Sequence, residues 1–142
     1  MVVDQLALVA WSRALVWLTA LALALSACNA ETRIPGPRLV ADGIEFQTQA
    51  APPGVEAEPA IAIARAAVAG IDREFGMDTS RQPDVVEFGI ARCSEAPSCL
   101  GADAGPGPWM VWHIKWQPIG SPSWIALLLD PTTSELIWIG AG

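Results

Sequence analysis

The sequence predicts a small α+β domain in which one amphipathic helix packs on a three- to four-stranded antiparallel meander sheet. Apolar residues recur every three or four positions between residues 59 and 75, which is the spacing of one helix face. Later segments have the short apolar or alternating patterns of β-strands, and turns rich in proline, glycine and aspartate separate them. A single helix laid across such a sheet would bury the apolar side of both.

The predicted helix runs from Pro59 to Phe75. Glu56 and Glu58 favour its positively charged amino end, and Pro59 suits the first turn, where its missing N–H needs no partner. Gly76 follows in the position that a left-handed C-cap favours. The apolar face comprises Ile61, Ala64, Val68, Ile71 and Phe75.

Strands are predicted at residues 84–91, 109–117, 123–129 and 135–139. The segment 93–108 is predicted as a loop because proline and glycine recur in it. Asp130 and Pro131 open a tight turn before the last strand. In the strand 109–117, one side carries Met110, Trp112, Ile114 and Trp116, and the other carries Trp109, Val111, His113 and Lys115.

The amino-terminal segment has the features of a secretory leader. Residues 14–27 are apolar and too few to span a bilayer comfortably. They end in Leu25-Ser26-Ala27-Cys28, which resembles the lipobox of bacterial lipoprotein precursors. The resemblance implies that Cys28 receives a diacylglyceryl group, that the signal peptide 1–27 is removed, and that acyl chains such as palmitate anchor the protein. The alternative is an uncleaved helix from about residue 6 to residue 27, long enough to span.

Removal of residues 1–27 from the 142-residue chain would leave 115 residues, which suits one domain and a tether. Residues 28–54 are interrupted by prolines and are predicted to be a mostly flexible, lipidated tether with a candidate short strand at 44–48. The α+β domain then occupies residues 55–142. The net charge of −7 disfavours nucleic-acid binding, because phosphate backbones repel such a protein.

The chain has three cysteines, so assigning Cys28 to lipid leaves Cys93 and Cys99. An exported domain lies in an oxidising compartment, which predicts a disulfide between them. The alternative is a metal site that includes His113, but its spacing does not resemble that of zinc modules. We therefore expect neither a metal nor a cofactor.

No catalytic residues are predicted. His113 is the only histidine, and it lies on the strand side opposite Trp112 and Trp116, so we expect it to be an exposed surface residue rather than a general base. The glycines at 101, 105 and 107 are interleaved with proline and precede a strand, which is unlike a phosphate-binding loop. The domain is therefore expected to be non-enzymatic.

A candidate binding face is suggested by apolar side chains on both sides of the sheet. One helix can cover only one side, and an uncovered apolar face often marks a contact surface. We expect this face to meet an exported protein or peptide, or a second copy of the chain. Alternatively, the tether or the strand at 44–48 covers it. The candidate residues are Trp109, His113, Ile125, Leu127 and Leu129.

Two segments resemble PepSY or PepSY-like domains: Val55-Glu-Ala-Glu-Pro-Ala-Ile-Ala-Ile-Ala64, and the ending that runs from Trp124 to Trp138 through Asp130-Pro-Thr-Thr-Ser-Glu135. Ser134 stands where that family usually has glycine, and a left-handed conformation there would cost about 1 kcal/mol. The resemblance implies a helix on a meander sheet and an inhibitory or regulatory role toward a peptidase or another exported protein.

The sequence therefore predicts a non-catalytic binding or regulatory lipoprotein of the cell envelope. Its lipid would lie in the outer face of the cytoplasmic membrane or in the outer membrane. Two alternatives stay open: a small-ligand binder that uses a Trp-rich sheet face, and a structural envelope protein.

Overall fold

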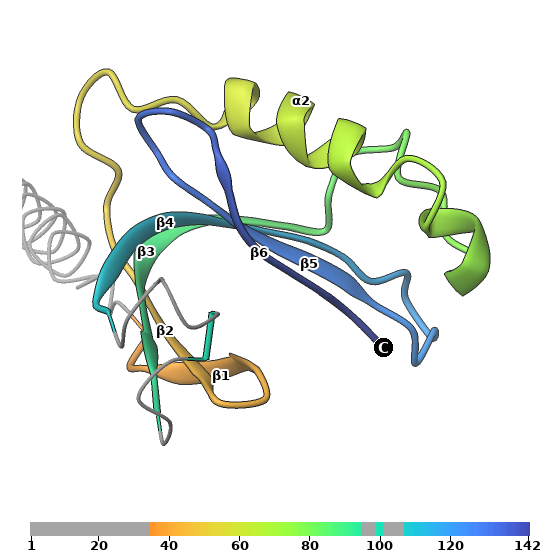
Figure 1. The fold of residues 1–142 in the computed structure, drawn as a ribbon, viewed down its shortest axis with the longest axis horizontal. Coiled ribbons are helices and arrows are strands. Elements are labelled where there is room, and N and C mark those ends of the chain that lie inside the picture. The colour runs from red at the N-terminus through yellow and green to blue at the C-terminus, as the bar shows by residue number, and fades with distance from the viewer. Residues whose placement is uncertain (1–34, 95–98, 101–106) are drawn as a thin grey trace, which may run out of the picture. The chain divides into compact units, whose positions relative to one another are not determined.

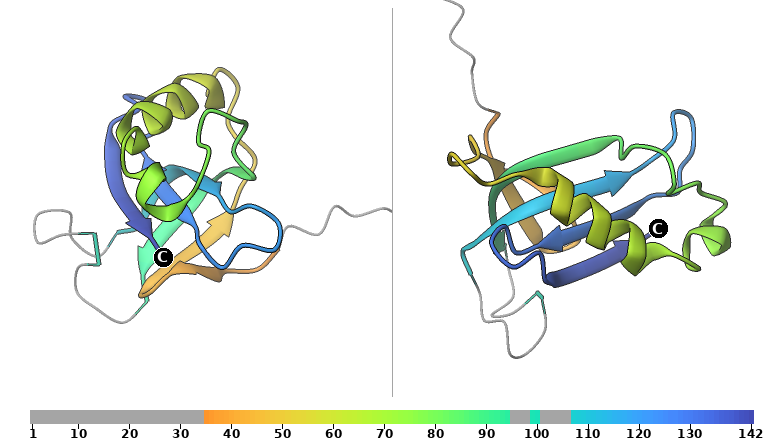
Figure 2. Two further views of the ribbon diagram at one scale, coloured as in Figure 1. Left: turned by 90° about the vertical axis from the view of Figure 1, so that its right-hand side faces the viewer. Right: turned by 90° about the horizontal axis from the view of Figure 1, so that it is seen from above.

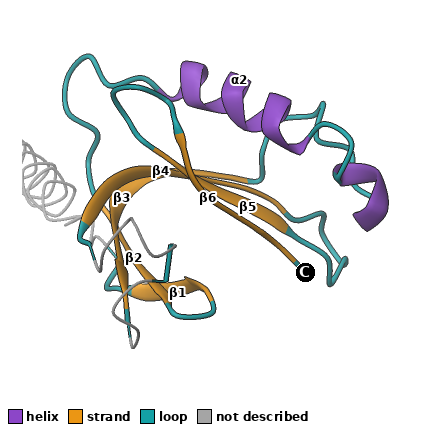
Figure 3. Cartoon of the chain, viewed as in Figure 1, coloured by secondary structure: helices purple, strands orange, loops and turns teal. Residues whose placement is uncertain are grey.

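The computed structural model describes residues 35–94, 99–100 and 107–142. These residues form one six-stranded antiparallel sheet in the order β1-β2-β3-β4-β5-β6, with one α-helix against it (Figure 1, Figure 3). The strands are β1 (Arg38–Ala41), β2 (Ile44–Thr48), β3 (Val85–Cys93), β4 (Trp109–Trp116), β5 (Ile125–Leu129) and β6 (Leu136–Ala141). The helix α2 (Ala57–Val68) and a 3-10 turn η1 (Asp72–Phe75) lie between β2 and β3.

The sheet is curled into a half-barrel. The helix α2 crosses its convex side, and the β1–β2 hairpin curves beneath the opposite side (Figure 1, Figure 2). We call the side that α2 covers the helix face and the opposite side the inner face. Residues of β1, β2 and β6 contribute to one cluster on the inner face, as this curl requires.

The prediction of one helix on a three- to four-stranded sheet is therefore wrong, because most of the domain is sheet and two strands precede the helix. Residues 38–48 form the β1–β2 hairpin, where the sequence predicts mostly a tether. Pro35 and Pro37 precede this hairpin, and Pro52 and Pro53 follow it, so none of them removes a donor from its ladder. The candidate strand at 44–48 is β2.

The predicted helix 59–75 is divided into two pieces. The helix α2 ends at Val68, and Gly70 has a φ of 105°, a conformation that interrupts a helix. The chain then continues as η1, which Gly76 caps. The φ of Gly76 is 64°, so this residue has the predicted left-handed conformation. Ala60, Ile61, Ala64 and Val68 are the buried residues of α2.

One apolar core lies on each side of the sheet. The helix-face core joins α2 to β3, β4 and β5, and it includes Trp112, Trp116 and Leu127. The inner core is smaller, with Ile44 and Phe46 of β2 packed among residues of the later strands. Its other buried members are Ala91, Val111 and Leu128. The hairpin thus covers the sheet side that a single helix leaves bare.

Candidate functional site

The five residues of the predicted binding face do not share one exposed surface. Ile125, Leu127 and Leu129 are fully buried in the helix-face core. Trp109 is half-buried on the inner face, and His113 on that face is 3% exposed. The alternation along β4 was right, but β5 pairs with it so that Leu128, not its odd-numbered neighbours, lies opposite His113. The expectation of an exposed His113 is wrong because the β1–β2 hairpin covers it.

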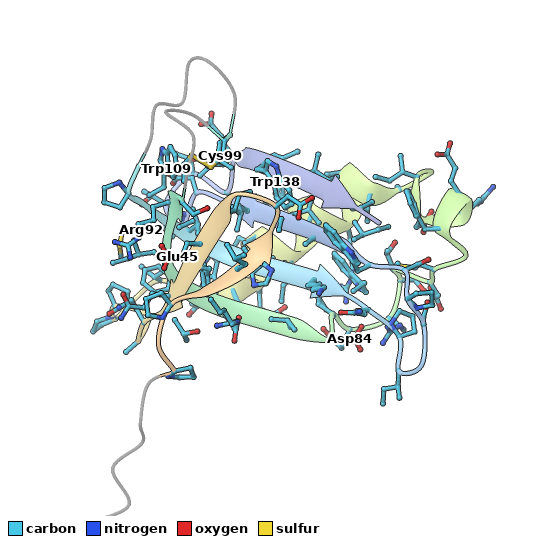
Figure 4. The ribbon with its side chains drawn as sticks, turned by 90° about the horizontal axis from the view of Figure 1, so that it is seen from below. Glu45, Asp84, Arg92, Cys99, Trp109 and Trp138 are labelled. Carbon is cyan, nitrogen blue, oxygen red and sulfur yellow. A yellow bond between two sulfur atoms is a disulfide. The ribbon has the colours of Figure 1, made fainter. Side chains whose placement is uncertain are left out.

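Cys28 lies outside the described residues. Cys93 and Cys99 form the predicted disulfide, with a Cα–Cα distance of 5.4 Å. Cys93 ends β3 and pairs with Ile44, while Cys99 packs against the inner core. Figure 4 views the sheet from the side away from α2, with Cys99 near Trp109 and Trp138 on β6. The disulfide thus fastens the chain after β3 to the inner face.

A polar cluster lies within the inner face. We define it as Arg38 of β1, Glu87 of β3 and His113 of β4. Glu87 and His113 are cross-strand partners, and the imidazole Nδ1 lies 3.3 Å from the Glu87 Oε2 atom. The Arg38 guanidinium donates to the same carboxylate and, at 3.1 Å, to the Thr48 hydroxyl. One carboxylate therefore joins strands that are not neighbours in the sheet.

An aromatic ring of β2 lies against the cluster, whose His113 is buried while Arg38 and Glu87 are partly exposed. The Phe46 ring lies 5.2 Å from the His113 ring, and the Arg38 guanidinium lies 5.4 Å from the centre of the Phe46 ring. When Nδ1 carries the proton and donates to Glu87, Nε2 is left as an acceptor. Among the described residues this buried Nε2 atom has no hydrogen-bond partner.

The charge state of His113 is set chiefly by its burial. Burial lowers the pKa of His113 below its ordinary value, because the positive imidazolium loses its hydration. The hydrogen bond and charge of Glu87 oppose this effect, while the positive charges of Arg38 and Lys115 lower the pKa further. The neutral ring is therefore the favoured form in the folded protein.

Arg38 and Glu87 are not among the site residues that the sequence predicts, because the sequence does not predict β1. The signal was present: Asp42-Gly43 separates Leu39-Val-Ala41 from the alternating segment 44–48, and an Asp-Gly pair between apolar runs is a strong hairpin signal. Gly43 has a φ of 74°, which suits that turn. Once β1 pairs with β2, Arg38 lies on the side of the sheet that carries Phe46.

A second feature is the edge strand β6. Trp124 and Gly142 exchange both backbone hydrogen bonds, with N···O distances of 2.7 and 3.0 Å. Because such pairs alternate along an antiparallel ladder, Ile139 and Ala141 direct their backbone groups away from β5. In the described sheet, no further strand lies beyond β6.

The two edges of the sheet differ in their chemistry. The edge strand β1 is only four residues long, carries Arg38 and contains a register shift, which are features that discourage pairing with another chain. The strand β6 has the sequence LIWIGA, without charge or proline. Its side chains Leu136 and Ile139 are 42% and 37% exposed. Of the two edges of the described sheet, β6 lacks the features that discourage pairing with another chain.

The described residues give no indication of a metal site or of a membrane-spanning helix. In residues 35–94, 99–100 and 107–142, no three His, Cys, Asp or Glu side chains gather as metal ligands. Over the same ranges, no helix combines the length and hydrophobicity that a membrane crossing requires. Comparisons of the chain with protein-family models, with curated proteins and with solved structures find no match.

Proposed function

We propose that this chain is a lipid-anchored envelope protein whose domain is a non-catalytic binding module. Its β6 edge accepts an extended segment of an exported protein or peptide. The observation that carries the proposal is the chemistry of β6, an edge strand of the described sheet: it is uncharged, lacks proline, and directs backbone donors and acceptors outward at Ile139 and Ala141. Strand addition uses these groups for affinity, and neighbouring side chains then select the segment.

Two features support the envelope location. The segment Leu25-Ser26-Ala27-Cys28 resembles a lipobox, which implies a lipid on Cys28. The bond between Cys93 and Cys99 is of a kind that persists in oxidising compartments and is rare in the cytosol. A diacylated cysteine holds a protein at a membrane more firmly than a single acyl chain does.

The edge is tested with Ile139→Lys, which puts a charge at a half-exposed position of β6. The control is Ile119→Lys, the same substitution at a fully exposed position of the β4–β5 turn. A display library of extended peptides is selected against the purified domain, and bound peptides are mapped by amide NMR shifts. We expect shifts in β6, at least about tenfold weaker binding to Ile139→Lys, and unchanged binding to Ile119→Lys.

Circular dichroism of both variants checks that the fold is kept. Peptides that bind without moving any β6 amide, or that bind Ile139→Lys as tightly as the wild type, would show that the edge is not the site. Sedimentation of the free domain addresses the alternative occupant. A wild-type dimer that Ile139→Lys dissociates would assign the edge to a second copy of the chain.

The anchor is tested separately by metabolic labelling with palmitate in a bacterial host. We expect label in the wild type and none in Cys28→Ser, while Cys93→Ser with Cys99→Ser keeps it. An unlabelled wild type, or label that survives in Cys28→Ser, would refute lipidation at this position.

A further inference from the structure

The two sides of the sheet differ in their buried titratable groups. Among the described residues, His113 is the one titratable side chain that is buried, and it lies on the inner face. It is 3% exposed and lies against Phe46 of the inner core and against its partner Glu87. A change in proton concentration therefore acts first on the inner side of the sheet.

The polar cluster also links the first strand to the middle of the sheet. Arg38 of β1 reaches over Phe46 of β2 to the Glu87 carboxylate on β3, with side chains that are 38% and 28% exposed. Glu87 in turn contacts His113 on β4. Backbone pairing within the described sheet joins β1 only to β2, so the Arg38 contact is a side-chain tie between β1 and β3.

Charge balance around His113 changes when the ring gains a proton. The charged groups that face it are Arg38 from β1, Glu87 from β3 and Lys115 from its own strand β4. The strand β2 contributes the uncharged Phe46 and Thr48, and β5 contributes Leu128. With neutral His113, two positive groups surround one carboxylate, whereas a third positive charge leaves a surplus of two. The protonated ring then repels both Arg38 and Lys115. Arg38 is the easier of the two to displace, because its strand β1 is at the edge of the sheet.

Hydrogen bonding favours the same movement. A protonated ring has a donor at Nε2, and a buried donor without an acceptor is costly. The Nε2 atom is buried and unpartnered among the described residues. Water can satisfy it only if the cover moves, and the cover includes Phe46, whose ring lies 5.2 Å from the imidazole.

We propose that the inner polar cluster is an acid-sensitive latch. Protonation of His113 loosens β1 and β2 from the inner face, while the helix-face core stays folded. The same step uncovers Phe46 and the apolar residues beneath it, so mild acid exposes an apolar surface that the hairpin covers at neutral pH.

The test combines hydrogen exchange with titration of the single histidine. Amide protection factors are measured by NMR between pH 7.5 and 4.5 and corrected for intrinsic exchange. In the wild type, amides of β1 and β2 should lose about tenfold in protection per pH unit once the pH falls below 6.5, while those of α2 and β5 change little. The imidazole shifts of His113 should have their midpoint below 6.5, and the loss of protection should level off near that midpoint.

Two variants separate the latch from general acid effects. His113→Gln cannot gain a charge and should hold β1 and β2 protection constant over this range. Glu45→Gln removes the ion pair, at 2.9 Å, between Glu45 of β2 and Arg92 of β3, and it should respond as the wild type does. The latch is refuted by any of three results. These are a His113 that titrates at or above 6.5, β1 and β2 protection that ignores pH, or loss of protection in α2 and β5 in equal proportion.

Should His113→Gln fail to fold, the wild-type titration and exchange still decide the proposal. A loss of protection that begins near 6.5 and levels off at the midpoint of the His113 titration, with α2 unaffected, supports the latch without any variant.

Discussion

Ser134 is the described residue other than glycine that has a positive φ, at 60°. It closes the β5–β6 turn, where its N–H donates to the Asp130 carbonyl at 2.9 Å. The Asp130 carboxylate accepts from the N–H groups of Thr132 and Thr133, both at 2.8 Å, and these bonds lower its pKa. The turn therefore holds a side-chain-bearing residue in a conformation that glycine adopts without cost.

Replacing Ser134 with glycine should raise the free energy of unfolding by up to about 1 kcal/mol. Relief of the left-handed conformation favours the folded state, although the greater freedom of glycine in the unfolded chain offsets part of the gain. Ser94→Gly, at an exposed position without a positive φ, should instead lower it by about 0.5 kcal/mol. Urea unfolding measures both values. A loss of stability in Ser134→Gly would show that the serine is held by contacts rather than strained.

For individual residues, side-chain alternation predicted which neighbours share a face of the sheet, but it did not predict whether that face is covered. Trp112 and Trp116 lie on one side of β4 and His113 on the other, as expected. The burial of His113 depends on Phe46 and Arg38, which are far from it in sequence. A local pattern carries no information about such a cover.

Among the elements, β3 shows how the sheet accommodates its curl. Gly89 lies in the middle of β3, paired with Thr48 on one side and Val111 on the other. A Cβ atom there would lie 2.2 Å from the Gln47 carbonyl oxygen and 2.6 Å from the Phe46 ring. The absence of a side chain lets Phe46 lie against the strand and fill the inner core.

Gly89→Ala should therefore lower the free energy of unfolding by about 2 kcal/mol or more, because the crowding atom on Gln47 is backbone and cannot turn away. The control is Gly36→Ala, where the new Cβ meets nothing within 4 Å and φ is not positive, so a change within about 0.5 kcal/mol is expected. Denaturant unfolding compares them. Equal stability of the two variants would mean that Phe46 and β2 shift freely.

The later elements were predictable because their patterns are local. The expected strands 84–91, 109–117, 123–129 and 135–139 correspond to β3 through β6, with ends that differ by a few residues. The strand β1 was missed, although β2 was expected as a candidate strand at 44–48, because prolines on both sides made residues 28–54 resemble a tether. The division of the helix follows from Gly70, whose positive φ the apolar spacing did not indicate.

For the whole molecule, the disulfide links loop, hairpin and inner core. Cys99 packs on that core, and its Cβ lies 4.0 Å from the position that a Cβ on Gly43 would take. The double variant Cys93→Ser with Cys99→Ser should lose about 2 kcal/mol of unfolding free energy, since the bond closes a short loop. Thermal melts with and without reductant test this. Reductant should destabilise the wild type and leave the double variant unchanged; an unaffected wild type would contradict the prediction.

The stability of the whole fold should fall in two separate acid ranges. Because the pKa of His113 is lowered by folding, the unfolded chain binds the proton first. Stability is then present above the ordinary histidine pKa of about 6.5 and is lost as the pH falls below it, with a limiting slope of about 1.4 kcal/mol per pH unit. The loss stops at the lowered pKa of the folded state.

The carboxylates act in a lower range. Hydrogen bonds from Arg81 and from the Gln117 N–H, at 2.6 Å, lower the pKa of Asp84, and local bonds lower those of Asp72 and Asp130. Their contribution is present above the ordinary value of 3.8 and is lost as the pH falls through the lowered pKa values. In urea unfolding at a series of pH values, His113→Gln should abolish the loss of stability just below pH 6.5 and keep the loss at lower pH. If the variant still loses stability just below pH 6.5, that acid sensitivity lies outside the inner core.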